Sequence, residues 1–373
     1  MFRAKSGAES VATPTVQRPP AEVLHADELA ELAKKDRDPK PPGWRLSLRA
    51  VRRFIAGEPE KDRPAKLMVP LSLIDRCMVT LASGRGLLLV GEPGTAKSLL
   101  SELLTAAISG SSALTVQGGA STTEDQIKYG WNYALLLNEG PSPRALVPGP
   151  ILTAMREGQI ARFEEITRCP AEVQDSLLSI LSERVLMVPE LEGDHSTIYA
   201  KPGFNLIATA NTRDRGVNEM SSALKRRFAF ETVFPISSLE DELALVKREA
   251  ARLLKQSGVD LTPPDDVIEV LVASFRELRQ GLDAEGGGME RLSTVLSTAE
   301  AVSVAHSVGL RGYYLRGDAG QASDIVEALA GTAVKDNAED LKKLRRYLEQ
   351  RVGKRTGSAW RAFYEARHLL PSA

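Results

Sequence analysis

A short apolar run that leads through a glycine-bearing turn into a lysine constrains this chain more than any other feature. Residues 86–98 read Gly-Leu-Leu-Leu-Val-Gly-Glu-Pro-Gly-Thr-Ala-Lys-Ser, and an apolar-periodic stretch follows over 99–108. The order of buried strand, phosphate loop and helix is typical of a nucleoside-triphosphate site. The alternative is a plain glycine turn between a core strand and a helix.

Glycines in such a loop let backbone N–H groups converge on phosphate oxygens at the positive end of the following helix. Lys97 would reach the outer phosphates, and the Ser98 hydroxyl would bind magnesium. Ala96 stands where a glycine normally precedes the lysine, and alanine is tolerated there if this residue keeps a negative φ. The predicted phosphate-binding residues are Gly91, Glu92, Pro93, Gly94, Thr95, Ala96, Lys97, Ser98 and Leu99.

Composition favours a globular protein of more than one domain. The 373 residues are 43% hydrophobic and 26% charged with a net charge of −1, so no global basic field indicates nucleic acid or an anionic membrane. Cys77 and Cys169 are not spaced for zinc, which favours a reducing compartment. No targeting segment and no apolar run near the roughly 20 residues of a membrane span is visible. We therefore expect a cytoplasmic protein.

Three further strands are predicted over 113–116, 159–163 and 204–208, separated by helices. This alternation predicts an α/β fold with a parallel sheet, whose chemistry lies at the carboxyl ends of the strands. Glu164 and Glu165 follow the second of these strands. In a phosphate-loop enzyme the first carboxylate holds magnesium and the second polarises the attacking water. Asn211, near the end of the third strand, either bonds the γ-phosphate or the water, or is a turn residue.

These motifs stand in the order of an AAA+ ATPase, and the segments between them narrow the resemblance. The stretch 149–158, the acidic strand end with its continuation to Pro170, and the predicted helix over 174–183 resemble the MoxR family. The similarity runs over about 67–309. Two predicted insertions, at 126–147 and 184–204, resemble hairpins of the branch that contains MoxR proteins, metal chelatases and dynein-like motors.

The resemblance implies an AAA+ core with a parallel sheet flanked by helices, an α-helical lid, ATP and Mg²⁺ as cofactors, and a homo-oligomeric ring, expected to be a hexamer. Arg227 would be the arginine finger that reaches the neighbouring subunit's site, with Arg226 as the reserve. Arg291, which opens a predicted lid helix, would be the sensor 2 arginine. The implied activity is chaperone-like remodelling of a partner protein that carries a von Willebrand A domain.

Four parts are predicted: a flexible N-terminal arm over 1–44 with a helical patch at 26–35, the core over 45–235, the lid over 236–337 and a helical extension over 338–373. Glu164 stands where the family usually has aspartate, so we expect slow hydrolysis. A nucleotide-gated scaffold with little turnover and a chelatase-like motor subunit remain alternatives. A nucleic-acid motor is not favoured, because the sequence shows no basic–aromatic interleaving for strand binding, and the basic run at 342–355, with Glu339, Asp340 and Glu349 interspersed, is typical of a solvated helix face.

Overall fold

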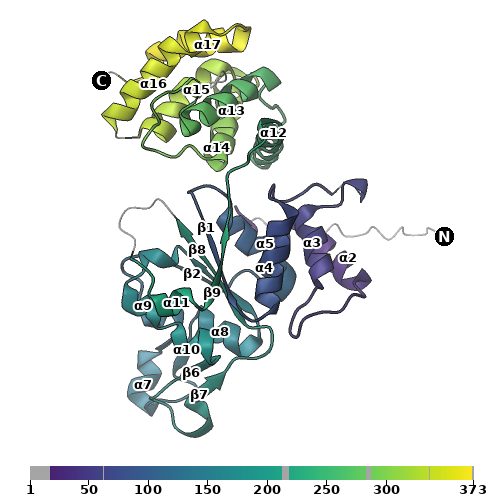
Figure 1. Cartoon of the computed structure of the whole chain (residues 1–373), viewed down its shortest axis with the longest axis vertical. Coiled ribbons are helices and arrows are strands. Elements are labelled where there is room, and N and C mark those ends of the chain that lie inside the picture. The colour runs from purple at the N-terminus through teal and green to yellow at the C-terminus, as the bar shows by residue number, and fades with distance from the viewer. Residues whose placement is uncertain (1–16, 62, 212–217, 283–286, 336, 372–373) are drawn as a thin grey trace, which may run out of the picture.

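A computed structural model describes residues 17–61, 63–211, 218–282, 287–335 and 337–371. An α/β core carries a parallel five-stranded sheet in the order β2-β5-β8-β1-β9, and a bundle of helices follows it (Figure 1). The strands of this sheet are β1 (Gly86–Gly91), β2 (Thr115–Gln117), β5 (Ile160–Glu164), β8 (Asn205–Asn211) and β9 (Phe228–Thr232). The predicted fold class is confirmed, and β1, β2, β5 and β8 lie at or next to their predicted positions, whereas β9 was not predicted.

Helices cover both faces of the sheet, which is why its central strands β1, β5 and β8 are almost wholly buried. Along β1, Leu87 and Leu89 enter the core shared with α3, α4 and α5, whereas Leu88 enters the opposite core with α8. The helices of the core and of the segment before it are α1 (Ala21–Leu24), α2 (Ala26–Lys35), α3 (Leu48–Ala56), α4 (Leu71–Ala82), α5 (Lys97–Ser109), α6 (Glu124–Ile127), α7 (Tyr133–Glu139), α8 (Pro150–Glu157), α9 (Ala171–Asp175), α10 (Leu178–Ser182) and α11 (Ser222–Lys225).

Both predicted insertions form antiparallel strand pairs. The first pairs β3 (Tyr129–Trp131) with β4 (Leu146–Pro148) and encloses α7. The second pairs β6 (Val185–Met187) with β7 (Thr197–Tyr199). α7, β6 and β7 lie at the end of the core that points away from the helical bundle (Figure 1). The two insertions therefore share one end of the molecule.

The segment before the core is packed rather than loose where it is described. Residues 1–16 of the predicted flexible arm lie outside the described residues, but residues 17–44 include α1 and α2, with Leu32 and Trp44 buried. The Ala21 amide donates to Glu102 Oε1 of α5 over 2.9 Å, and Glu22 accepts from the Ser112 amide over 2.9 Å. These bonds and the buried side chains hold the segment against the core.

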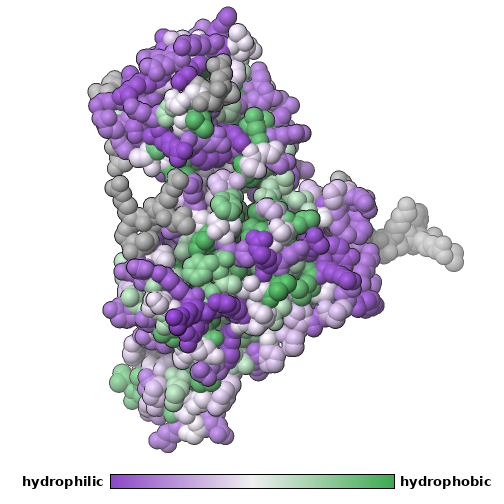
Figure 2. Space-filling model, in the orientation of Figure 1, coloured by the Kyte–Doolittle hydropathy of each residue, from purple (hydrophilic) through white to green (hydrophobic). Residues whose placement is uncertain are grey.

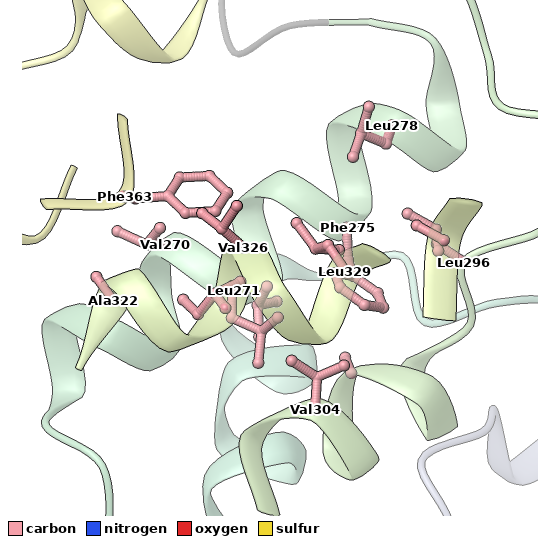
Figure 3. Packing of buried hydrophobic residues seen from close by; sticks show 14 of the residues in the cluster. Val270, Leu271, Phe275, Leu278, Leu296, Val304, Ala322, Val326, Leu329 and Phe363 are labelled. Atoms are coloured by element: carbon pink, nitrogen blue, oxygen red, sulfur yellow. The ribbon is translucent and has the colours of Figure 1, made fainter. Parts of the chain in front are cut away.

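The C-terminal helices form one bundle with one apolar core. They are α12 (Leu239–Gln256), α13 (Asp265–Gln280), α14 (Thr298–Arg311), α15 (Ala322–Leu329), α16 (Ala338–Gln350) and α17 (Ser358–Glu365). Figure 3 shows Phe363 of α17 beside Val270 and Val326, in the same cluster as Phe275 and Leu329. Buried side chains thus continue across the predicted boundary at 337/338, so residues 338–370 pack on the lid as part of it.

The surface differs between these parts. On the face drawn in Figure 2 the bundle presents mostly hydrophilic residues, whereas apolar residues gather over the core below it. None of the described helices has the length and apolar character needed to cross a membrane.

Candidate nucleotide site

A cavity of about 1050 Å³ lies where the phosphate loop, the N-terminal segment and the bundle meet. Residues of four parts of the chain line this cavity. They are Glu92 to Leu99 of the loop, Glu165, Thr209 and Asn211 at the strand ends, Arg18 and His25 of the N-terminal segment, and Arg248, Arg252, Arg279 and Ser297 of the bundle. Most of the predicted site residues therefore come together in one place. The segment before the core contributes a wall that the sequence did not predict.

The loop between β1 and α5 has the sharp backbone turns of a phosphate loop. Gly94 has φ +75°, and a Cβ there would lie 2.0 Å from Ser297 Cβ, so the bundle rests directly on the loop. Ala96 has φ 64° and ψ 27°, in the left-handed region. The condition under which alanine avoids strain here, a negative φ, is therefore not met. A left-handed conformation costs a residue with a Cβ about 1–2 kcal/mol, which the missing glycine would have avoided.

Lys97 begins α5 and is buried, with a relative exposure of 7%. Its ammonium donates to the carbonyl oxygens of Gly91 over 3.1 Å and Glu92 over 2.7 Å. The charge is thereby held at the loop, at the positive end of the helix dipole, where it favours an anion.

Glu164 lies behind Ser98, whose hydroxyl donates a hydrogen bond to Glu164 Oε2 over 2.6 Å. Thr209 Oγ1 donates to the same oxygen over 2.8 Å, while Ser101 and Arg162 bond Oε1 over 2.8 Å and 2.7 Å. Burial raises the pKa of Glu164, but the bond from Ser98, the Arg162 charge and the other two hydroxyls together hold the pKa below its usual range. The carboxylate is therefore charged at neutral pH.

The pair formed by Ser98 and Glu164 suits a magnesium ion. A hydroxyl that donates its hydrogen bond to a carboxylate keeps its lone pairs for a cation. Mg²⁺ is bound in proteins by few oxygen ligands together with phosphates and waters. The residues that the sequence singled out for the metal thus fit it in type, charge and mutual contact.

Glu165 faces the cavity from the end of β5. Its backbone has φ 54° and ψ 47°, a conformation that costs about 1–3 kcal/mol for such a residue and is often found at functional sites. Asn211 Nδ2 lies 3.4 Å from Glu165 Oε1, and Arg168 Nε lies 2.5 Å from Oε2. Glu165 and Asn211, predicted separately, are therefore neighbours.

Arg226 and Arg227 lie at the amino end of β9, whereas the loop follows the carboxyl end of β1, so they are at opposite ends of the parallel strands. They precede β9, whose Phe228 is in register with Gly86 at the start of β1, and β1 runs from there to the loop. Arg227 donates to Ser182 Oγ over 2.8 Å and to the Ala223 carbonyl over 3.2 Å. Arg226 is exposed. Neither lines the cavity of its own chain.

Arg291 does not open a helix and does not line the described cavity wall. It is exposed and donates to the Gln280 carbonyl over 2.7 Å. α14 begins at Thr298 because Ser297 and Glu300 form a capping box there. The bundle arginines that reach the cavity are Arg248, Arg252 and Arg279.

Sequence reasoning missed Arg162, Ser101 and Thr209 around Glu164. Arg162 had a signal, since a charged residue inside a fully buried parallel strand is unexpected. Ser101 stands one turn after Ser98 on α5, and helical spacing predicts that both face the same way. The cavity arginines of α12 and α13 are indistinguishable in sequence from exposed helix charges.

Comparison with known proteins shows the family of this chain. A family model described as an AAA domain of the dynein-related subfamily matches residues 86–228, and one described as a YehL-like AAA+ ATPase C-terminal domain matches residues 240–371. Fold and site thus define an AAA+ ATPase domain with a helical domain behind it. Protein YehL of Escherichia coli (strain K12) is 60% identical over 356 residues, which cover 95% of this chain and 98% of that protein. The chain belongs to the YehL family.

Other similarities are weaker. Protein SH1500 of Staphylococcus haemolyticus is 30% identical over 211 residues, which cover 57% of this chain and 74% of that protein. Among solved structures, NtrX from Brucella abortus in complex with ADP has a TM-score of 0.47 and 12% identity. The match covers 81% of this chain, and the chain spans 64% of the NtrX chain.

Proposed function

We propose that this protein binds ATP with Mg²⁺ in the cavity, hydrolyses the nucleotide slowly, and uses the resulting motion of the bundle to remodel a partner protein. The observation that carries the proposal is the 2.6 Å contact between Ser98 Oγ and Glu164 Oε2 directly behind the phosphate loop. A buried, charged carboxylate and a hydroxyl at a helix start are of little structural use to a plain glycine turn.

Each residue has a role that its position supports. Lys97 binds the outer phosphates, and Ser98 with Glu164 holds the magnesium ion, which neutralises charge on the phosphates when bound. Glu165 accepts a proton from the attacking water, and Asn211 orients that water. The 3.4 Å contact between Asn211 Nδ2 and Glu165 Oε1 puts both groups at the same side of the cavity.

A ring, expected to be a hexamer, would complete the site. Arg226 and Arg227 lie at the end of the parallel strands that is far from their own phosphate loop, so a finger from this position acts only on a neighbouring subunit. Arg227 is the residue that the MoxR resemblance favours, whereas the exposed side chain of Arg226 is the more accessible of the two.

The partner proposal rests on the MoxR resemblance and on the two insertions. We propose a von Willebrand A domain protein in the cytoplasm and a chaperone-like outcome. Tyr133 and Leu137 of the first insertion are 70% and 89% exposed, and Met187 and Tyr199 of the second are 64% and 71% exposed. Exposed apolar side chains at one end of the molecule are suited to contact with another protein.

A nucleotide-gated scaffold is the second candidate, and one contact favours it. Arg168 Nε lies 2.5 Å from Glu165 Oε2 and competes with water for that carboxylate oxygen. A steady-state ATP turnover assay separates the two, because a scaffold binds nucleotide without sustained phosphate release.

The decisive experiment is nucleotide binding by titration calorimetry. Lys97→Ala is expected to abolish detectable ATP binding, because the buried ammonium at the loop is lost. Lys225→Ala is the matched control, since this lysine pairs with Glu219 on the surface, with side-chain exposures of 42% and 86%. Equal affinity of Lys97→Ala and the unaltered protein would remove the phosphate-loop assignment.

A further inference from the structure

A buried ion pair lies directly behind the phosphate loop. Arg162 of β5 is 8% exposed, within a strand that is buried from end to end. Its Nη2 donates to Glu164 Oε1 over 2.7 Å. Residues two apart on a strand point to the same face, and here both side chains reach α5. Because an unpaired buried charge is strongly unfavourable, each of these two groups depends on the other.

The same guanidinium also holds the first turn of α5. Nη2 donates to the Ser98 carbonyl over 3.1 Å, and Nε donates to Ser101 Oγ over 2.9 Å. Ser101 Oγ is itself 2.8 Å from Glu164 Oε1. One side chain thus fixes the carboxylate and the backbone that carries Ser98.

Each carboxylate oxygen of Glu164 has its own pair of hydrogen-bond partners. Oε1 is bonded by Arg162 and Ser101, whereas Oε2 is bonded by Ser98 and Thr209. With Oε1 held, the carboxylate cannot turn away from Ser98 without losing a charged hydrogen bond. An aspartate, one methylene shorter, would not reach both sets of donors from the same backbone position. This gives a physical reason for glutamate at position 164.

We propose that Arg162 is a positioning residue for magnesium. By holding Glu164 Oε1 and the Ser98 carbonyl, it fixes Glu164 Oε2 and the Ser98 hydroxyl where the magnesium ion of the nucleotide complex binds. The inference rests on the proposed nucleotide site and extends it to a side chain behind the cavity wall. Removing an outer partner of a metal ligand commonly weakens metal binding by about 10- to 100-fold.

The test is a Mg²⁺ titration of nucleotide binding, followed by the fluorescence of a non-hydrolysable ATP analogue. Arg162→Met is expected to raise the Mg²⁺ concentration at half-maximal binding about 10- to 100-fold. Binding of the analogue in EDTA, which depends on the loop and Lys97, is expected to stay unchanged. Arg162→Lys keeps the charge but lacks the planar fork, so its midpoint should fall between the two.

A double-variant cycle adds a second readout. As a single change, Glu164→Asp is expected to raise the Mg²⁺ midpoint. Added to Arg162→Met it should raise the midpoint little further, because both changes break the same contact. Arg355→Met is the matched control, since it removes a guanidinium paired with Glu277 in the bundle. It should lower the unfolding temperature and leave the Mg²⁺ midpoint unchanged.

Ser101→Ala serves if Arg162→Met does not fold, and it should shift the midpoint in the same direction by a smaller factor. Unchanged midpoints in the folded Arg162 and Ser101 variants would overturn the positioning role and leave the nucleotide site standing. Failure of the unaltered protein to bind the analogue at all would instead overturn the proposed function.

Discussion

The Ala21 amide donates to Glu102 Oε1 over 2.9 Å and so ties α1 to the helix that follows the phosphate loop. Ala21 and Glu102 are 4% and 7% exposed, and Arg18 adds an ion pair to the same carboxylate. Because residues of this segment also line the cavity, nucleotide affinity and the seating of α1 should be linked.

Glu102→Ala is expected to loosen α1 and weaken nucleotide binding. The buried Ala21 amide would lose its acceptor, at a cost of about 1–3 kcal/mol. Limited proteolysis should cut near residues 17–25 faster than in the unaltered protein, and calorimetry should show a higher Kd. Lys35→Ala is the control, because this lysine lies outside the cavity wall and its exposed ion pair with Glu31 on α2 contributes little. A resistant Glu102→Ala chain with unchanged Kd would contradict the link.

Ala96→Gly is expected to stabilise the protein without nucleotide. Glycine removes the strain of φ 64° but adds chain entropy to the unfolded state, which leaves a net gain of up to about 1 kcal/mol. Denaturant unfolding measures it. The same change at Ala106, in the interior of α5, should instead cost about 1 kcal/mol or more. A loss of stability at both positions would show that the loop is not strained at Ala96.

Ala96 also shows where sequence reasoning stops. The positions of four strands, both insertions and the group formed by Lys97, Ser98 and Glu165 followed from motifs, because local periodicity and strand-end chemistry determine them. The backbone angle of one loop residue depends on what packs over it, and here the bundle rests on the loop through Ser297. Long-range contacts of this kind, which also place α1 against α5, have no signature in a single sequence.

Arg291 illustrates the opposite failure. Its neighbourhood reads as the start of a helix, yet the capping box of Ser297 and Glu300 starts α14 later. Tertiary contacts explain the difference, since Asp340 of α16 accepts from the Ser293 amide over 2.9 Å and holds this stretch in a non-helical bend. The sensor 2 prediction therefore does not carry over to Arg291, and cavity-lining arginines of α12 and α13 replace it as candidates.

Glu165→Gln is expected to preserve nucleotide binding and lower turnover by about 10²–10⁴-fold, because the proton acceptor is lost. Phosphate release in steady state measures the effect. Arg168→Ala should act in the other direction, since it frees Glu165 Oε2 from a 2.5 Å contact. If Glu164→Gln stops hydrolysis while Glu165→Gln does not, the two carboxylates have exchanged roles. Background turnover in every variant and in the unaltered protein would favour the scaffold.

Mixed assemblies test the arginine finger. Arg227→Ala chains are expected to lose turnover when alone, or Arg226→Ala chains if the reserve residue is the finger, and a finger of this kind contributes about 10³–10⁵-fold in rate. Mixing the inactive one with Lys97→Ala chains should restore some activity, because one subunit supplies the arginine and the other the loop. Activity that never recovers at any mixing ratio would assign that arginine a structural role, such as the Arg227 contact with Ser182.

Acid should destabilise the protein through His25. Burial, and then the charges of Lys66 and Arg252 against that of Glu249, lower its pKa from 6.5 to about 4. Between these values the unfolded chain binds more protons than the folded one, so stability falls as the pH drops from 6.5 towards 4. His25→Gln should flatten thermal unfolding temperature over this range, whereas His368→Gln, at an exposed site, should not. Parallel profiles for all three proteins would exclude His25 as the cause.

The contact between Gly94 and Ser297 has a mechanical consequence. Ser297 caps α14, and α14 shares one continuous core with every helix from α12 to α17. When a rigid body rotates about one point of contact, the displacement of each part grows with its distance from that point. A movement at the loop too small to alter the loop's own shape therefore becomes larger in the distant helices. The outermost helices, α16 and α17, would then travel furthest when the loop closes on a phosphate, which makes them the place to attach a probe of the nucleotide state.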